Sequence, residues 1–160
     1  MEDYLPKSEF LGLAGSGGVP LAGSEFADGN LKLLISFTRD PDKSNRDWAT
    51  MALGMYGPDT QITRDALIAA ADDEDCDVRG EAIEALAERD ASIALPLVQR
   101  DLSRSPCGYG VFVAAALIAD SSLIEPLTKF DRDTDAGWMD ELIRDAIRAC
   151  QLGDPRVQRC

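Results

Sequence analysis

The stretch "DVRGEAIEAL" (residues 77–86) decides the fold, because its R-x-x-A-x-x-A-L pattern recurs along the chain. "RDWATMAL" (46–53) carries the same pattern 33 residues earlier, and partial copies follow in "GVFVAAAL" (110–117) and "IRDAIRAC" (143–150). Small residues spaced three and four apart lie on one face of an α-helix, where they let a neighbouring helix approach closely. A fixed period of this length predicts an array of similar helices.

A second helix is predicted after each of the first three copies. Asp residues stand in the turns where a helix N-cap is expected, and apolar segments continue over residues 60–71, 91–103 and 121–130. An earlier helix is expected over residues 30–37. Pro96 and Pro126 fall in first turns, where proline is tolerated. The predicted fold is therefore all-α, an α-α superhelix of about four helical hairpins.

The pattern D-x-D-V-R-x-x-A-x-x-A-L, from Asp75 to Leu86, resembles HEAT repeats. The short period is similar to that of the phycobilisome-lyase-like HEAT proteins. The resemblance covers about residues 25–157 and implies a HEAT-like solenoid whose second helices line the concave side. It also implies that Asp and Arg side chains join stacked repeats, so Asp75 or Asp77 is expected to pair with Arg46 or Arg79. Such arrays serve many unrelated roles, so the resemblance leaves function open.

Two regions of different character are expected. Residues 1–24 are rich in glycine and form either a flexible lead-in or an irregular N-terminal cap, whereas residues 25–160 form the repeat domain. A short helical turn around residues 8–14 would lay apolar side chains over the first repeat, because the last face of a solenoid needs a cap.

The acidic run at Asp72, Asp73, Glu74 and Asp75 is interpreted as the end of one helix and the cap of the next, where anions are favoured. A calcium loop would need a glycine and a distal glutamate that this run lacks. The chain also has no histidine, which removes His-based metal sites and His-dependent catalysis. We therefore expect no enzyme activity, no metal and no cofactor.

Departures from the repeat mark candidate partner-binding residues. The position before the first small residue is Trp48, Glu81, Phe112 and Asp145 in successive copies. It is polar in two of them, so an outward-facing position and aromatic anchors for a partner are expected. The alternative is that Trp48 packs under the N-terminal segment and that Phe112 is buried.

The third copy departs furthest, because "SPCGYGVF" (105–112) replaces the acid-and-arginine signature with glycines. The array is expected to bend there, or a ligand or partner backbone to approach closely; drift of the repeat is the plainer alternative. The full set of partner-binding candidates is Trp48, Tyr109, Phe112, Asp72, Asp73 and Glu74.

Cys76 and Cys107 occupy the same place in adjacent copies. Stacked helices lie about 8–10 Å apart, whereas the Cα atoms of a disulfide lie about 4.4–6.8 Å apart. Two free thiols are predicted.

The net charge of the chain indicates which class of partner to expect. Acids outnumber bases 29 to 16, for a net charge of −13. A nucleic-acid partner is therefore not expected, and the expected partner is a protein with a basic patch. The alternative is that the charge serves solubility alone. The leading hypothesis is a non-enzymatic protein-binding scaffold or adaptor with an acidic surface. One alternative is an inhibitor or immunity protein that masks a basic toxin or enzyme. Another is a tetrapyrrole lyase-like subunit, which would need a reactive Cys76 or Cys107.

Location and assembly are less constrained by the sequence. No run of 18 apolar residues exists, and the acidic start does not look like a secretory signal. A cytoplasmic protein without membrane contact is expected, as a monomer or a weak homodimer.

Overall fold

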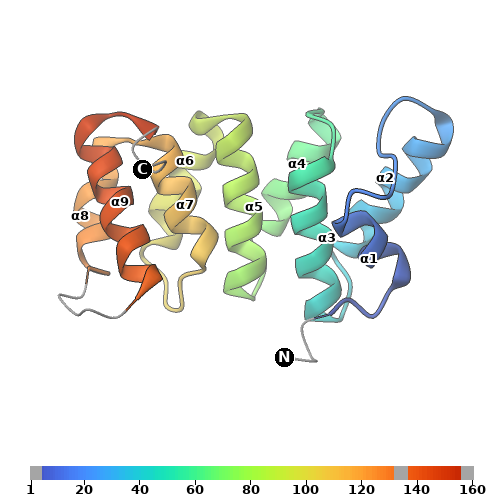
Figure 1. The fold of residues 1–160 in the computed structure, drawn as a ribbon, viewed down its shortest axis with the longest axis horizontal. Coiled ribbons are helices and arrows are strands. Elements are labelled where there is room, and N and C mark those ends of the chain that lie inside the picture. Colours follow the sequence, from blue (N-terminus) through green and yellow to red (C-terminus); the bar gives the residue numbers. More distant parts are fainter. Residues whose placement is uncertain (1–4, 132–136, 156–160) are drawn as a thin grey trace.

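The computed structural model describes residues 5–131 and 137–155, and in these ranges the chain consists of helices joined by turns (Figure 1). Each hairpin has a first and a second helix. The first helices are α1 (Glu9–Gly15), α3 (Lys43–Tyr56), α5 (Cys76–Arg89), α7 (Tyr109–Ile118) and α9 (Trp138–Leu152). The second helices are α2 (Glu25–Phe37), α4 (Gln61–Ala70), α6 (Ala91–Asp101), and the 3-10 helix η2 (Ser121–Leu123) leading into α8 (Ile124–Thr128). The all-α superhelix is confirmed.

Three of the α-helices begin at an aspartate whose carboxylate caps them. Asp42 and Asp75 are the N-caps of α3 and α5, and Asp90 caps α6 by accepting from the backbone N–H of Ser92. At α4 the cap is Thr60 instead of the preceding Asp59, because the Asp59 carboxylate binds Arg64 at 2.7 Å. These caps satisfy backbone N–H groups that a helix leaves unpaired at its start.

The N-terminal segment belongs to the array. Helix α1 buries Leu11 and Ala14, and Phe10 stacks on Phe37 of α2 with ring centroids 6.0 Å apart. Helix α2 starts earlier than the predicted residues 30–37, because the Ser24 side chain caps it. Helix α1 packs on α3 as the first helix of the stack.

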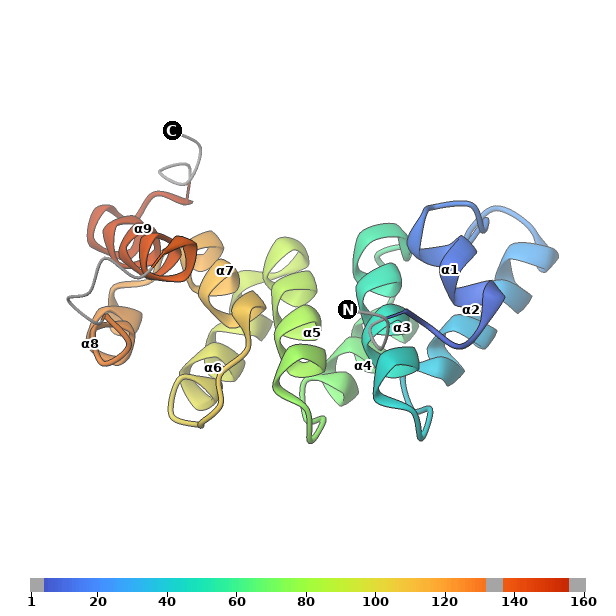
Figure 2. The same cartoon turned by 60° about the horizontal axis from the view of Figure 1, so that its bottom comes forward.

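The first helices form the tighter layer of the stack. They pack directly on one another from α1 through α3, α5 and α7 to α9, and no two second helices of the described chain pack as closely. The small residues of the repeat are buried in this layer, among them Ala49, Ala52, Ala82 and Ala85. Figure 2 shows the consequence: the row of first helices is bowed, with the second helices on its outer side. The first helices thus line the concave side, and the expectation that the second helices do so is wrong.

Glycines bring α5 and α7 into backbone contact. A Cβ atom on Gly108 would lie 2.1 Å from the Cys76 carbonyl oxygen, and one on Gly110 would lie 2.4 Å from that of Gly80. A side chain at either position would force the two helices apart. The close approach expected at this copy is therefore made by the chain's own preceding helix.

Candidate protein-binding surface

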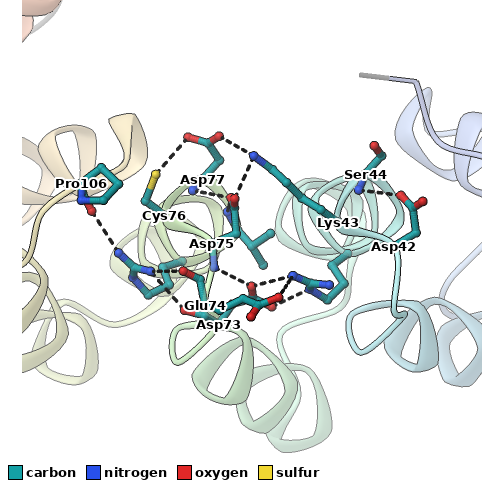
Figure 3. Close-up of polar contacts among 12 residues, drawn as sticks. Asp42, Lys43, Ser44, Asp73, Glu74, Asp75, Cys76, Asp77 and Pro106 are labelled. Atoms are coloured by element: carbon teal, nitrogen blue, oxygen red, sulfur yellow. Dashed lines mark hydrogen bonds and ion pairs between the residues drawn. The ribbon is translucent and has the colours of Figure 1, made fainter. Parts of the chain in front are cut away.

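The acidic loop (Asp72, Asp73, Glu74 and Asp75) joins α4 to α5, and Figure 3 shows the contacts of its last three residues. The Asp73 carboxylate accepts two hydrogen bonds from Arg46 of the preceding repeat, from Nε at 2.8 Å and from Nη2 at 3.1 Å. Both side chains are about nine-tenths buried. Asp73, a predicted partner-binding residue, thus lies between repeats. The neighbouring Glu74, in contrast, is open to solvent, with its side chain 87% exposed.

The other acids of the loop also have cationic neighbours. Asp72 lies 2.6 Å from the Nη1 atom of Arg100, and Asp75 lies 2.8 Å from the Nζ atom of Lys43. Burial opposes ionisation of Asp75, but hydrogen bonds from Lys43 and two backbone N–H groups outweigh it and lower its pKa. Ligand atoms of Asp75, Cys76 and Asp77 come within 4.8 Å of one another, yet Lys43 already supplies a cation there. Charge in the acidic loop is largely neutralised.

The two signature arginines each pair with a carboxylate, but not with the acids that the sequence suggested. Arg46 binds Asp73, and the Nε atom of Arg79 donates to Asp101 at 2.8 Å, a carboxylate without solvent exposure. The expected partners, Asp75 and Asp77, instead point toward Lys43 (Figure 3). The predicted pairing is therefore wrong.

The reason lies in how each arginine folds back on its own loop. The Nη1 group of Arg46 donates to the carbonyls of residues 40 and 41, and that of Arg79 donates to those of residues 73 and 74. This position puts each guanidinium beside the loop, away from the first turn of the helix where Asp75 and Asp77 lie. The Nη2 group of Arg79 also reaches the carbonyl of Pro106 in the next repeat.

The predicted aromatic anchors have different fates. The Trp48 ring is partly buried against Gly15 of α1, where a Cβ atom would lie 2.8 Å from it. Phe112 is 3% exposed and packs edge-on against Phe130 at 5.2 Å, so the prediction that it faces outward is wrong. Both follow the alternative of buried packing. Tyr109 differs, because it is 43% exposed.

The concave side of α5 carries a glutamate stripe (Glu81, Glu84 and Glu88). These side chains make no hydrogen bond or ion pair with any residue that the structure describes. A hollow of about 60 Å³ beside them is lined by Met51, Gly54 and Met55 of α3 and by Glu81, Glu84, Ala85 and Glu88 of α5. We did not single out this stripe from the sequence. Its signal was the spacing of four, three and four residues from Asp77 through the stripe, which places all four acids on one helix face.

Electrostatics single out the same stripe. Burial, reinforced by the charges of Asp47 and Asp77, raises the pKa of Glu81 to about 7. Burial, with the charges of Glu81 and Glu88, raises the pKa of Glu84 to about 7 as well. Carboxylates in this state lack a cationic neighbour, and a cation supplied from outside would lower both values. The stripe is thus suited to binding a positively charged group.

Cys76 and Cys107 are free thiols, as predicted. Burial raises the pKa of Cys107 to about 12, and burial together with Asp77 and Asp75 raises that of Cys76. At neutral pH both remain thiols, which are poor nucleophiles.

Comparison with known proteins agrees with this architecture. The sequence pattern that defines HEAT repeats matches residues 30–118. Over 105 residues, 63% of this chain, the sequence is 29% identical to Protein YibA of Escherichia coli strain K12 and equally to Protein YibA of strain O157:H7. The aligned part spans only 38% of those relatives.

A solved structure has the same arrangement of helices. The X-ray structure of YibA from E. coli superposes with a TM-score of 0.59 at 22% identity, over 89% of this chain and 54% of that chain. At this identity the likeness concerns the fold alone.

Proposed function

The chain belongs to the HEAT-repeat family, and on that premise we propose that it is a non-enzymatic protein-binding scaffold or adaptor. Its acidic concave face would recruit a partner that carries a basic patch. The observation that carries this proposal is the glutamate stripe, which has no cationic partner within the described chain. Charge complementarity of this kind sets association rate and specificity more than affinity.

The basic side chains nearby are engaged in holding the repeats together. Arg46 and Arg79 bind buried carboxylates, and Arg100 binds Asp72 and the Ala71 carbonyl. The Nη2 group of Arg89 donates to the carbonyl of Gly54 at 2.7 Å, near the end of α3. With these cations committed to structure, the three glutamates of the stripe on α5 are left without a cationic partner in the described chain.

The lyase-like alternative finds less support. It would need a reactive thiolate, and the raised pKa values of Cys76 and Cys107 disfavour one.

Free thiols suit a reducing compartment, which supports the expected cytoplasmic location. No helix in the described ranges is both long and apolar enough to cross a bilayer.

Affinity capture with a matched control tests the proposal. Glu81→Gln/Glu84→Gln/Glu88→Gln removes the stripe's three charges, and Glu25→Gln/Asp28→Asn/Asp65→Asn removes three exposed charges from α2 and α4. We expect the wild type and the control to retain a basic protein that salt releases, and the stripe variant to lose it. Equal retention by both variants would refute the acidic-binder proposal. If the captured protein loses its own activity when bound, the chain acts as an inhibitor.

A further inference from the structure

An exposed aromatic pair stands beside the glutamate stripe on the concave layer of helices. Tyr109 begins α7 and Trp138 begins α9, and their ring centroids lie 5.4 Å apart with the ring planes at 58°. Their exposed fractions are 43% and 64%, whereas Phe112 is buried and its ring partner Phe130 is half-buried. Two large rings exposed together at one spot are typical of a binding surface.

The rings and the carboxylates belong to one patch. The Glu84 Oε2 atom lies 3.0 Å from the place of a Cβ atom on Gly110, the residue after Tyr109. Burial, and then the charges of Glu84 and Glu81, raise the pKa of the Tyr109 phenol, so both carboxylates are within electrostatic reach of its ring. The patch therefore offers aromatic surface and hydrogen-bond acceptors side by side.

We propose that the arginine patch (Glu81, Glu84, Tyr109 and Trp138) binds an arginine side chain of the basic partner. A guanidinium can lie on an aromatic ring while its N–H groups donate to a carboxylate. A lysine ammonium is more strongly hydrated and lacks the planar fork, so it would use the carboxylates but gain less from the rings. A quaternary ammonium has no N–H group and would leave the acceptors of both glutamates unused. The inference rests on the proposed function and names the chemistry that the partner must carry.

Peptide binding separates this inference from the proposed function. The probes are a fluorescein-labelled Gly–Arg repeat peptide and its Gly–Lys twin, titrated with the full chain and followed by fluorescence anisotropy at fixed ionic strength. We expect the arginine peptide to bind about three- to tenfold more tightly. Tyr109→Leu/Trp138→Leu should bring the ratio of the two affinities close to one. Phe26→Leu, which removes an exposed ring from α2, should leave the ratio unchanged.

Each result has one meaning. Equal binding of both peptides, lost in Glu81→Gln/Glu84→Gln but unaffected in Tyr109→Leu/Trp138→Leu, would overturn the arginine patch and leave the acidic-binder proposal standing. Binding of neither peptide to the folded wild type would overturn both. Unchanged circular dichroism spectra ensure that the variants are folded.

Discussion

The acidic loop and the glutamate stripe are two acidic regions of one short segment, and they have opposite environments. The loop acids lie beside Arg46, Lys43 and Arg100, and Asp73 is nearly buried in its ion pair. The stripe begins only six residues beyond Asp75, on the concave side of α5. Its glutamates form no ion pair with a cationic side chain of the described chain. The loop looks more like a binding site in the sequence, because its acids are consecutive, yet the stripe is the region whose charge is available to a partner.

The difference shows that local charge density is a poor guide to available charge. Acids at a helix N-terminus accept hydrogen bonds from backbone N–H groups and from neighbouring arginines, so they stabilise the stack. Glu81 and Glu84, farther along the same helix, are half-buried without a cationic partner, and this burial, reinforced by the charges of neighbouring acids, favours their protonation instead. Stability should therefore depend on the loop, and binding should depend on the stripe.

Replacing Asp73 should produce the largest loss of stability. Asp73→Ala leaves the nearly buried Arg46 guanidinium without its two-bonded carboxylate, and we expect a loss of about 2–4 kcal/mol in the free energy of unfolding. Urea denaturation measures this loss. A change below about 0.5 kcal/mol, as is usual for exposed pairs, would contradict the assignment of Asp73 to the interface between repeats.

Removing a charge from the glutamate stripe should raise stability, whereas replacing Asp73 should lower it. The pKa of Glu84 in the folded protein, about 7, lies above its ordinary value of 4.5, so the folded state binds more protons between these values. Stability should then fall as pH rises from about 4.5 to 7, and Glu84→Gln should remove part of that fall. After allowance for partial exposure, we expect the variant to be about 1–2 kcal/mol more stable than the wild type at pH 8.

Urea denaturation at pH 5 and pH 8 measures this effect. Glu25→Gln, at an exposed position on α2, provides the matched control and should leave the pH dependence unchanged. A wild-type protein whose stability rises between pH 5 and pH 8 would contradict the burial of the stripe.

Asp72 should give the smallest effect of the set. Its side chain is 65% exposed, so the pair with Arg100 is screened by solvent. Asp72→Asn should change the free energy of unfolding by less than about 0.5 kcal/mol. An effect as large as that of Asp73→Ala would show that the loop acids act as a unit.

The repeat made much of the fold predictable. The spacing of small residues marks the first helices, and Asp75 was expected at the N-cap that it occupies. Both features depend on local sequence and on helix geometry alone. The curvature was not predictable in the same way, because it depends on how closely whole layers pack.

The candidate site was harder to predict, because it depends on which side chains of different helices meet. Phe112 is buried by Phe130, a contact that the position of Phe112 within its own helix does not reveal. Arg79 selects Asp101 from the end of α6 over the nearer Asp77, since its guanidinium turns toward the loop. The glutamate stripe was readable as a helical spacing, but only the packing of α3 and α7 beside α5 shows that it stays open.

The most direct test compares the two acidic regions in one binding measurement. Affinity of the Gly–Arg peptide would be measured for the wild type, for Glu81→Gln/Glu84→Gln/Glu88→Gln and for Asp72→Asn/Glu74→Gln at the same ionic strength. We predict that the stripe variant loses affinity by about tenfold or more, while the loop variant stays within about twofold of the wild type. If both variants instead lose affinity in proportion to the number of charges removed, the account is contradicted, because binding would then follow net charge and not the position of the stripe.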